Sequence, residues 1–150
     1  MTQEEKELLI KDLCARLPYG IIVHTWYNEC IDIKCIGIDL YTNAINLDIP
    51  NDDDAKVYID NVKPYLRPMS SMTQEEIDEY DSELDKDLNI VMNGALDKDR
   101  HITSNGKHNF SKNFVEHFGN DWLNSHHFDY LGLIEKGLAL EAPEGMYKTE

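Results

Sequence analysis

Basic residues are scarce in this chain. Its 150 residues include 14 Lys and Arg against 29 Asp and Glu, which gives a formal net charge of −15 at pH 7. A chain of this charge repels the phosphates of nucleic acid, so we expect no direct nucleic-acid binding. The same charge favours a protein partner whose surface is basic, and it leaves the oligomeric state open.

Long apolar runs are also missing. No stretch approaches the roughly 18 residues of a membrane-spanning helix, so no membrane partner is expected. The N-terminus is acidic and has a helical pattern, whereas a secretory signal peptide begins with basic residues before an apolar segment. Cysteine is limited to Cys14, Cys30 and Cys35, an odd number. We interpret these cysteines as small, reduced, buried side chains in a cytoplasmic protein.

Motifs typical of enzymes are absent from the sequence. It contains no Gly-x-Ser-x-Gly elbow, no Gly-rich phosphate loop after a strand and no His-x-x-x-His pair. The cysteines alone do not provide the four ligands of a structural zinc site. The sequence therefore predicts no catalytic residue, no metal and no cofactor, and it favours a protein that is not an enzyme.

Local signals divide the first half of the chain into a helix and strands. A capping box formed by Thr2 and Glu5 predicts a helix over residues 3–17. Gly37 interrupts a period-two pattern and predicts a β-bulge. Apolar patterns separated by turn residues predict four strands, at residues 21–28, 30–41, 44–49 and 56–60.

Residues 62–68 form a junction between strand-like and helix-like sequence. Pro64 and Pro68 each remove a backbone donor and restrict the residue before them. We therefore predict a tight turn or one turn of 3₁₀ helix over residues 63–68, and neither a helix interior nor a central strand.

Acidic helices are predicted after the junction. Thr73 and Glu76 form a second capping box, and Asp129 is expected to cap a short helix that Gly137 ends. Apolar stripes at helical spacing support these assignments. The predicted helices span residues 74–96, 112–126 and 130–136.

These elements predict a single α+β domain over residues 1–150. Residues 1–68 would form the N-terminal helix and a small curved antiparallel β-meander or partly open barrel, with the helix over one open end or face. Residues 69–150 would be mainly helical. We expect the C-terminal segment 128–147 to pack back near residues 62–72.

Four basic side chains are candidates for binding an anionic ligand. Lys63 and Arg67 lie on the rigid junction; the alternative is that they neutralise nearby acids, with Arg67 structural and Lys63 exposed. His126 and His127 are the other two candidates. Neighbouring residues on a helix point in directions about 100° apart, so these histidines share no face for a metal ion. Trp26 is assigned to the core.

Four strings of sequence carry a family resemblance. They are KDLCARLPYG at residues 11–20, VKPYLRPMSSMT at 62–73, HHFDY at 126–130 and GLIEKGLALEAPEGMY at 132–147. Together they resemble a family of short uncharacterised proteins from gut Bacteroidales genomes and their phages. The resemblance implies a phage or mobile-element context and a cytoplasmic location. It implies no activity, cofactor or catalytic residue.

The leading functional hypothesis is a non-enzymatic interaction or regulatory protein, because a strong charge imbalance accompanies the lack of catalytic motifs. The first alternative is a protein that binds a small anionic ligand between the junction and the C-terminal segment. The second alternative is a metalloenzyme that depends on its histidines.

Overall fold

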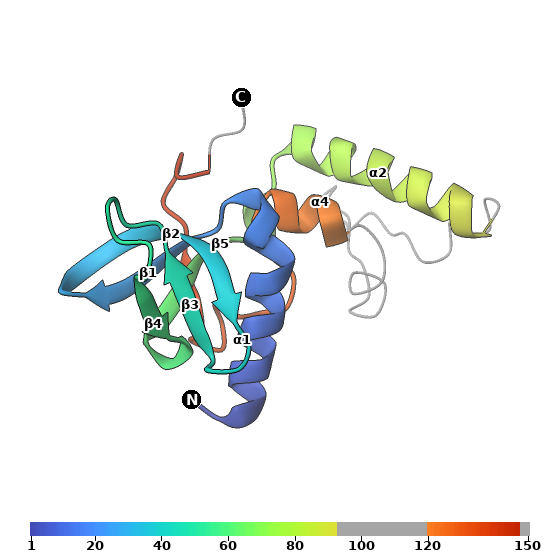
Figure 1. The fold of residues 1–150 in the computed structure, drawn as a ribbon. Coiled ribbons are helices and arrows are strands. Elements are labelled where there is room, and N and C mark those ends of the chain that lie inside the picture. The colour runs from blue at the N-terminus through green and yellow to red at the C-terminus, as the bar shows by residue number, and fades with distance from the viewer. Residues whose placement is uncertain (93–119, 148–150) are drawn as a thin grey trace.

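The computed structural model describes residues 1–92 and 120–147 of the chain, and Figure 1 shows their arrangement. An N-terminal helix packs on a mixed seven-stranded sheet that is not closed, and further helices follow. This arrangement is an α+β fold, as predicted. The described elements are α1 Gln3–Arg16, η1 Leu17–Tyr19, β1 Ile22–Tyr27, β2 Glu29–Asp39, β3 Ala44–Leu47, β4 Lys56–Tyr58, η2 Ile59–Asn61, β5 Val62–Pro68, η3 Met69–Ser71, α2 Gln74–Met92, α4 Asn120–Ser125, β6 Phe128–Asp129 and β7 Leu140–Glu141.

Both predicted capping boxes are formed. The Thr2 hydroxyl accepts from the Glu5 backbone, and the Glu5 carboxylate accepts from the Thr2 backbone, at the start of α1. Thr73 and Glu76 repeat this exchange at the start of α2. Each box satisfies backbone donors that the first turn of a helix leaves free, which is why these two helix starts were readable from local sequence.

Strands β1 to β4 form the predicted antiparallel meander, in the order β4-β3-β2-β1. The register between β2 and β3 shifts between Cys35 and Gly37, which confirms the predicted bulge. A Cβ at Gly37 would lie 2.6 Å from the Asn46 amide nitrogen. A larger residue at this bulge would therefore require the Asn46 side chain to move.

The prediction of a turn over residues 63–68 is wrong, because this stretch belongs to β5, Val62–Pro68, and lies inside the sheet. Val62, Pro64 and Leu66 are buried and alternate with more exposed residues. Lys63 pairs with His24 in an antiparallel arrangement, so the backbone N–H and C=O of Lys63 point toward β1. The backbone groups of the next residue, Pro64, point to the other side of the strand. Pro64 therefore needs no donor toward β1, and Pro68 is the last residue of the strand.

The C-terminal segment returns to the junction, as predicted. Strands β6 and β7 both pair with β5 in parallel, through Arg67 with Phe128 and Tyr65 with Leu140. The Arg67 backbone N–H donates to the carbonyl of His127 at 2.7 Å. Residues 128–129 and 140–141 therefore belong to the same sheet as residues 62–68.

Two apolar clusters stabilise the fold. The larger one lies between α1, the sheet and the C-terminal segment, and includes Leu9, Leu13, Leu66 and Leu133. The smaller one joins α2 and α4; its members are Met72, Ile77, Tyr80, Trp122, Leu123 and Phe128. In Figure 1, α2 extends away from the sheet with α4 beside its first part.

Several sequence assignments need correction. Residues 130–136 form turns and not a helix, although the Asp129 carboxylate accepts from the backbone of Leu133 and Ile134 as a cap would. Trp26 is 63% exposed and therefore lies outside the core. Cys35 is buried as expected, but Cys14 and Cys30 are exposed. The predicted helix 112–126 is described only for its last part, α4, and the end of the predicted helix 74–96 lies outside the described residues.

None of the helices in the described part of the chain is both long enough and apolar enough to span a membrane.

Candidate functional site

Two of the four candidate residues line one cleft. This cleft has a volume of about 770 Å³ and lies between the end of β5, the start of α2 and the C-terminal residues 141–147, with Arg67 and His126 in its wall. His127 is not in the wall, and Lys63 lies elsewhere, exposed on β5 opposite His24. The structure therefore divides the predicted anion-binding set.

The wall of the cleft is acidic. Five glutamates line it: Glu75, Glu76, Glu79, Glu141 and Glu144. The remaining wall includes proline and tyrosine surface, from Pro68, Pro143 and Tyr147. Carboxylates in this number disfavour an anion and favour a cation, since field lines concentrate in a cleft with low-dielectric walls.

Arg67 is already occupied by one of these glutamates. Its two terminal nitrogens each donate to a carboxylate oxygen of Glu76 at 2.7 Å. The guanidinium also lies over the ring of Phe128, 4.1 Å from the centroid. Burial acts to raise the pKa of Glu76, but the bonds from Arg67 and Thr73 outweigh it and hold the pKa below its usual value. Arg67 is thus a structural clamp between β5, α2 and β6.

The other four glutamates are not neutralised in this way. Among the described residues, no Lys, Arg or His lies within ion-pair distance of Glu75, Glu79, Glu141 or Glu144. Glu75 and Glu79 are one helical turn apart on α2 and are both exposed. The cleft therefore presents uncompensated negative charge to solvent.

His126 is held by its own helix end. Its ring stacks on Trp122 with centroids 4.0 Å apart, and Nδ1 lies 2.9 Å from the Trp122 carbonyl oxygen. A carbonyl only accepts, so Nδ1 carries the proton and Nε2 is an acceptor in the neutral ring. A neutral His126 offers no donor to an anion in the cleft.

His127 is a core residue with only 3% of its surface exposed. Its Nε2 donates to the carbonyl of Tyr19 at 3.1 Å, and its ring stacks on Tyr147 at 3.8 Å. The backbone has a positive φ of 59°, so the chain turns sharply between α4 and β6. Burial lowers the pKa of His127 to about 4, with the nearby Arg16 acting in the same direction. This histidine is neutral near pH 7 and serves to dock the C-terminal segment.

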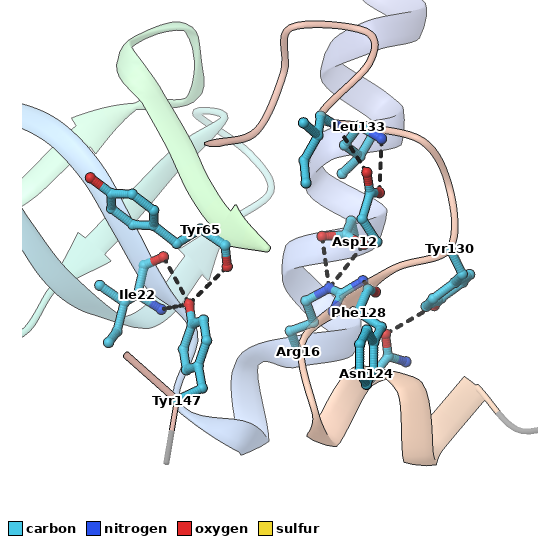
Figure 2. Close-up of polar contacts among 11 residues, drawn as sticks. Asp12, Arg16, Ile22, Tyr65, Asn124, Phe128, Tyr130, Leu133 and Tyr147 are labelled. Atoms are coloured by element: carbon cyan, nitrogen blue, oxygen red, sulfur yellow. Dashed lines mark hydrogen bonds and ion pairs between the residues drawn. The ribbon is translucent and has the colours of Figure 1, made fainter. Parts of the chain in front are cut away.

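Sequence inspection missed the ion pair that anchors this segment. Arg16 and Asp12, one turn apart on α1, are both fully buried and paired at 2.9 Å. Arg16 also donates to the carbonyl of Phe128, which Figure 2 shows on the far side of the guanidinium from α1. Burial raises the pKa of Asp12, against the opposing effect of Arg16. A signal was present, because Leu9, Asp12, Leu13 and Arg16 share one helical face.

Tyr147 completes the joint between the sheet and the C-terminus. Its hydroxyl accepts from the backbone N–H of Ile22 at 2.9 Å and donates to the carbonyl of Tyr65 at 2.9 Å (Figure 2). The hydroxyl stands where the next rung of the β1–β5 ladder would form. Burial raises the pKa of Tyr147 well above its ordinary range. We name the set Asp12, Arg16, His127 and Tyr147 the buried joint.

Metal chemistry finds no support in this region. Among the side chains that the structure describes, those of residues 1–83 and 120–147, no group of three or more His, Cys, Asp or Glu is placed to share an ion. The histidine-dependent metalloenzyme hypothesis therefore has no site among these residues.

Comparison of the chain with protein-family models, with curated proteins and with solved structures finds no match.

Proposed function

We propose that this chain is a non-enzymatic interaction protein whose acidic cleft binds a basic segment of a partner protein. One observation carries the proposal: five glutamates line the cleft, and within the described part of the chain only Glu76 is paired with a cation. A Lys or Arg side chain entering the cleft would meet unpaired carboxylates on both the α2 side and the C-terminal side.

The uncharged wall of the cleft suits such side chains as well. Lys and Arg bury their aliphatic stems against apolar surface while the charged ends reach a carboxylate. Pro143 and Tyr147 supply this kind of surface beside Glu141 and Glu144. Arg is favoured over Lys, because a planar guanidinium can bind a carboxylate through two parallel hydrogen bonds.

The proposed setting is the cytoplasm of a bacterial cell, in a phage or mobile-element context. The four strings that resemble the Bacteroidales and phage family support this context. The lack of any disulfide among Cys14, Cys30 and Cys35 is what a reducing compartment would give.

A binding titration tests the proposal. A fluorescently labelled arginine-rich peptide should bind the full chain, and Glu75→Gln with Glu79→Gln should weaken binding at least tenfold, about 1.4 kcal/mol. The matched control is Asp53→Asn with Asp54→Asn, which removes the same charge from an exposed loop. Equal weakening in both double variants would show a general charge effect and contradict a specific cleft.

The anionic-ligand hypothesis for this cleft has little physical support. Arg67 is bound by Glu76, the Nδ1 of His126 is engaged by the Trp122 carbonyl, and His127 is turned into the core. Of the four candidates, only Lys63 stays exposed without an ion pair within the described residues.

A further inference from the structure

Lys63 belongs to a row of charged side chains on the outer face of the sheet. Asp32, His24 and Lys63 are direct cross-strand partners on β2, β1 and β5. The His24 Nδ1 lies 2.7 Å from an Asp32 oxygen, which shows that these side chains share a face. The Tyr65 hydroxyl donates to the same oxygen at 2.9 Å, which places Tyr65 there too.

This network satisfies one Asp32 oxygen by hydrogen bonds from His24 and Tyr65, without using a lysine. The bond from His24 makes the largest contribution to lowering the pKa of Asp32. Lys34 is two residues from Asp32 on β2 and lies on the same face by strand alternation. Neither Lys34 nor Lys63 pairs with a carboxylate of the described residues. The Asp32 carboxylate is therefore hydrogen-bonded by His24 and Tyr65, and both lysines remain without a carboxylate partner among the described residues.

An exposed aromatic surface adjoins this charged row. Trp26 is two residues from His24 on β1, so its indole stands on the same face about 7 Å along the strand. The side chain is 63% exposed. It pairs with exposed Cys30 and not with another large side chain, so the indole is open to a ligand.

We propose that this outer face binds a small ligand that carries a phosphate next to a flat ring, of the nucleoside monophosphate class. The ring would stack on Trp26, and the phosphate would be held by Lys63, which pairs with His24 two residues from Trp26. Stacking on an exposed aromatic side chain tolerates different bases, because every base has a π-face. This site is independent of the acidic cleft.

The net charge of −15 does not prevent such binding at physiological salt. Charges separated by more than the Debye length, about 8 Å at 0.15 M ionic strength, are largely screened from each other. The glutamates at the start of α2 follow the end of β5 that is opposite to Lys63, and the Asp32 carboxylate on this face is engaged by His24 and Tyr65. A polymer with many phosphates would extend past the lysines into acidic surface, which favours a single small ligand.

Isothermal titration of the full chain with adenosine monophosphate (AMP) tests the site, with inorganic phosphate and adenosine as separate probes. AMP should bind more tightly than either probe. Trp26→Ala and Lys63→Ala should each weaken AMP binding about tenfold, as expected for one stacked base or one charged contact. Asp32→Asn should bind AMP severalfold more tightly, because a like charge is removed, and loss of folding cannot produce that gain.

Two control variants match the site variants in residue type. Tyr41→Ala removes an aromatic side chain that is 96% exposed, and Lys11→Ala removes an exposed lysine on α1. Both should bind AMP like the parent chain. Absence of AMP binding at millimolar concentration, unchanged affinity in Trp26→Ala, or equal affinity for phosphate and AMP would each overturn the proposal.

Discussion

Two polar networks of this protein use the same chemistry in opposite surroundings. The buried joint combines a carboxylate, an arginine, a histidine and a tyrosine, with Asp12, Arg16 and His127 almost wholly inaccessible. The outer face combines Asp32, Lys63, His24 and Tyr65 in solvent. In the joint, water does not reach the charged groups, so Asp12 and Arg16 depend on each other and Arg16 on the Phe128 carbonyl. On the outer face, a lysine is left without a partner because solvent satisfies it at little cost.

The difference separates structural from binding residues. Three of the four basic candidates, Arg67, His126 and His127, make hydrogen bonds within the fold, His127 through Nε2. Charged and polar side chains remain available to a ligand only where they are exposed and are not already hydrogen-bonded within the protein. Binding chemistry is therefore expected at the unpaired glutamates of the cleft and at Lys63.

The largest test of this comparison removes Arg16. Arg16→Ala should lower the free energy of unfolding by about 3–5 kcal/mol, because it leaves Asp12 buried without its partner. Replacing both residues, as Asp12→Leu with Arg16→Met, should recover much of that loss. Urea unfolding measures both, with Lys11→Ala as the exposed control on the same helix. A loss below 1 kcal/mol in Arg16→Ala would mean that the joint is not the anchor.

Acid should destabilise the protein through His127. Its pKa is lowered to about 4 in the folded chain, against an ordinary value of about 6.5, so the unfolded chain binds more protons between these values. This histidine should therefore remove about 3 kcal/mol of stability as pH falls from about 6.5 to about 4. Urea unfolding across this range should show the loss, and His127→Asn, which tolerates a positive φ, should flatten it. An identical pH slope in both proteins would contradict the account.

Removal of Arg67 should have a smaller effect, since its side chain is only partly buried. Arg67→Ala should destabilise by about 1–3 kcal/mol, through the loss of two charge-assisted hydrogen bonds to Glu76 and the contact with Phe128. Arg67→Lys should recover only part of this, because an ammonium cannot form the two parallel bonds. Full recovery in the lysine variant would show that charge alone matters here. Urea unfolding of the parent chain, Arg67→Ala and Arg67→Lys measures these differences in the free energy of unfolding.

The smallest effect is expected on the outer face. Lys63→Ala should change the free energy of unfolding by no more than about 0.5 kcal/mol, as for most exposed positions. The same variant is expected to weaken AMP binding about tenfold, so stability and binding should respond independently. If Lys63→Ala destabilised as much as Arg67→Ala, the two networks would not differ in the way proposed.

The features predicted correctly from sequence depend on neighbouring residues. The two capping boxes, the meander and the bulge at Gly37 each follow from short-range pattern. Strand β5 is not predicted because proline usually interrupts a strand. Pro64 is tolerated here because its position requires no backbone donor toward β1. A period-two pattern shows that alternate side chains lie on opposite faces of a strand, but it does not show which face is buried. The prediction that Trp26 lies in the core fails for this reason. The sequence predicts a site between the junction and the C-terminal segment, which is where the cleft lies, but not its acidic wall, because the glutamates of α2 and of residues 141–144 come together only through long-range packing.

A two-ligand NMR titration of the full chain tests the central claim most directly, because it reports every backbone amide and both indoles. The arginine-rich peptide should shift the amides of Glu75, Glu79 and residues 141–145, and AMP should shift Lys63 and the Trp26 indole. Amides of Arg16 and His127 should stay in place in both titrations. Peptide and AMP shifts that coincide on one surface, or that centre on the buried joint, would contradict the division between structural and binding networks.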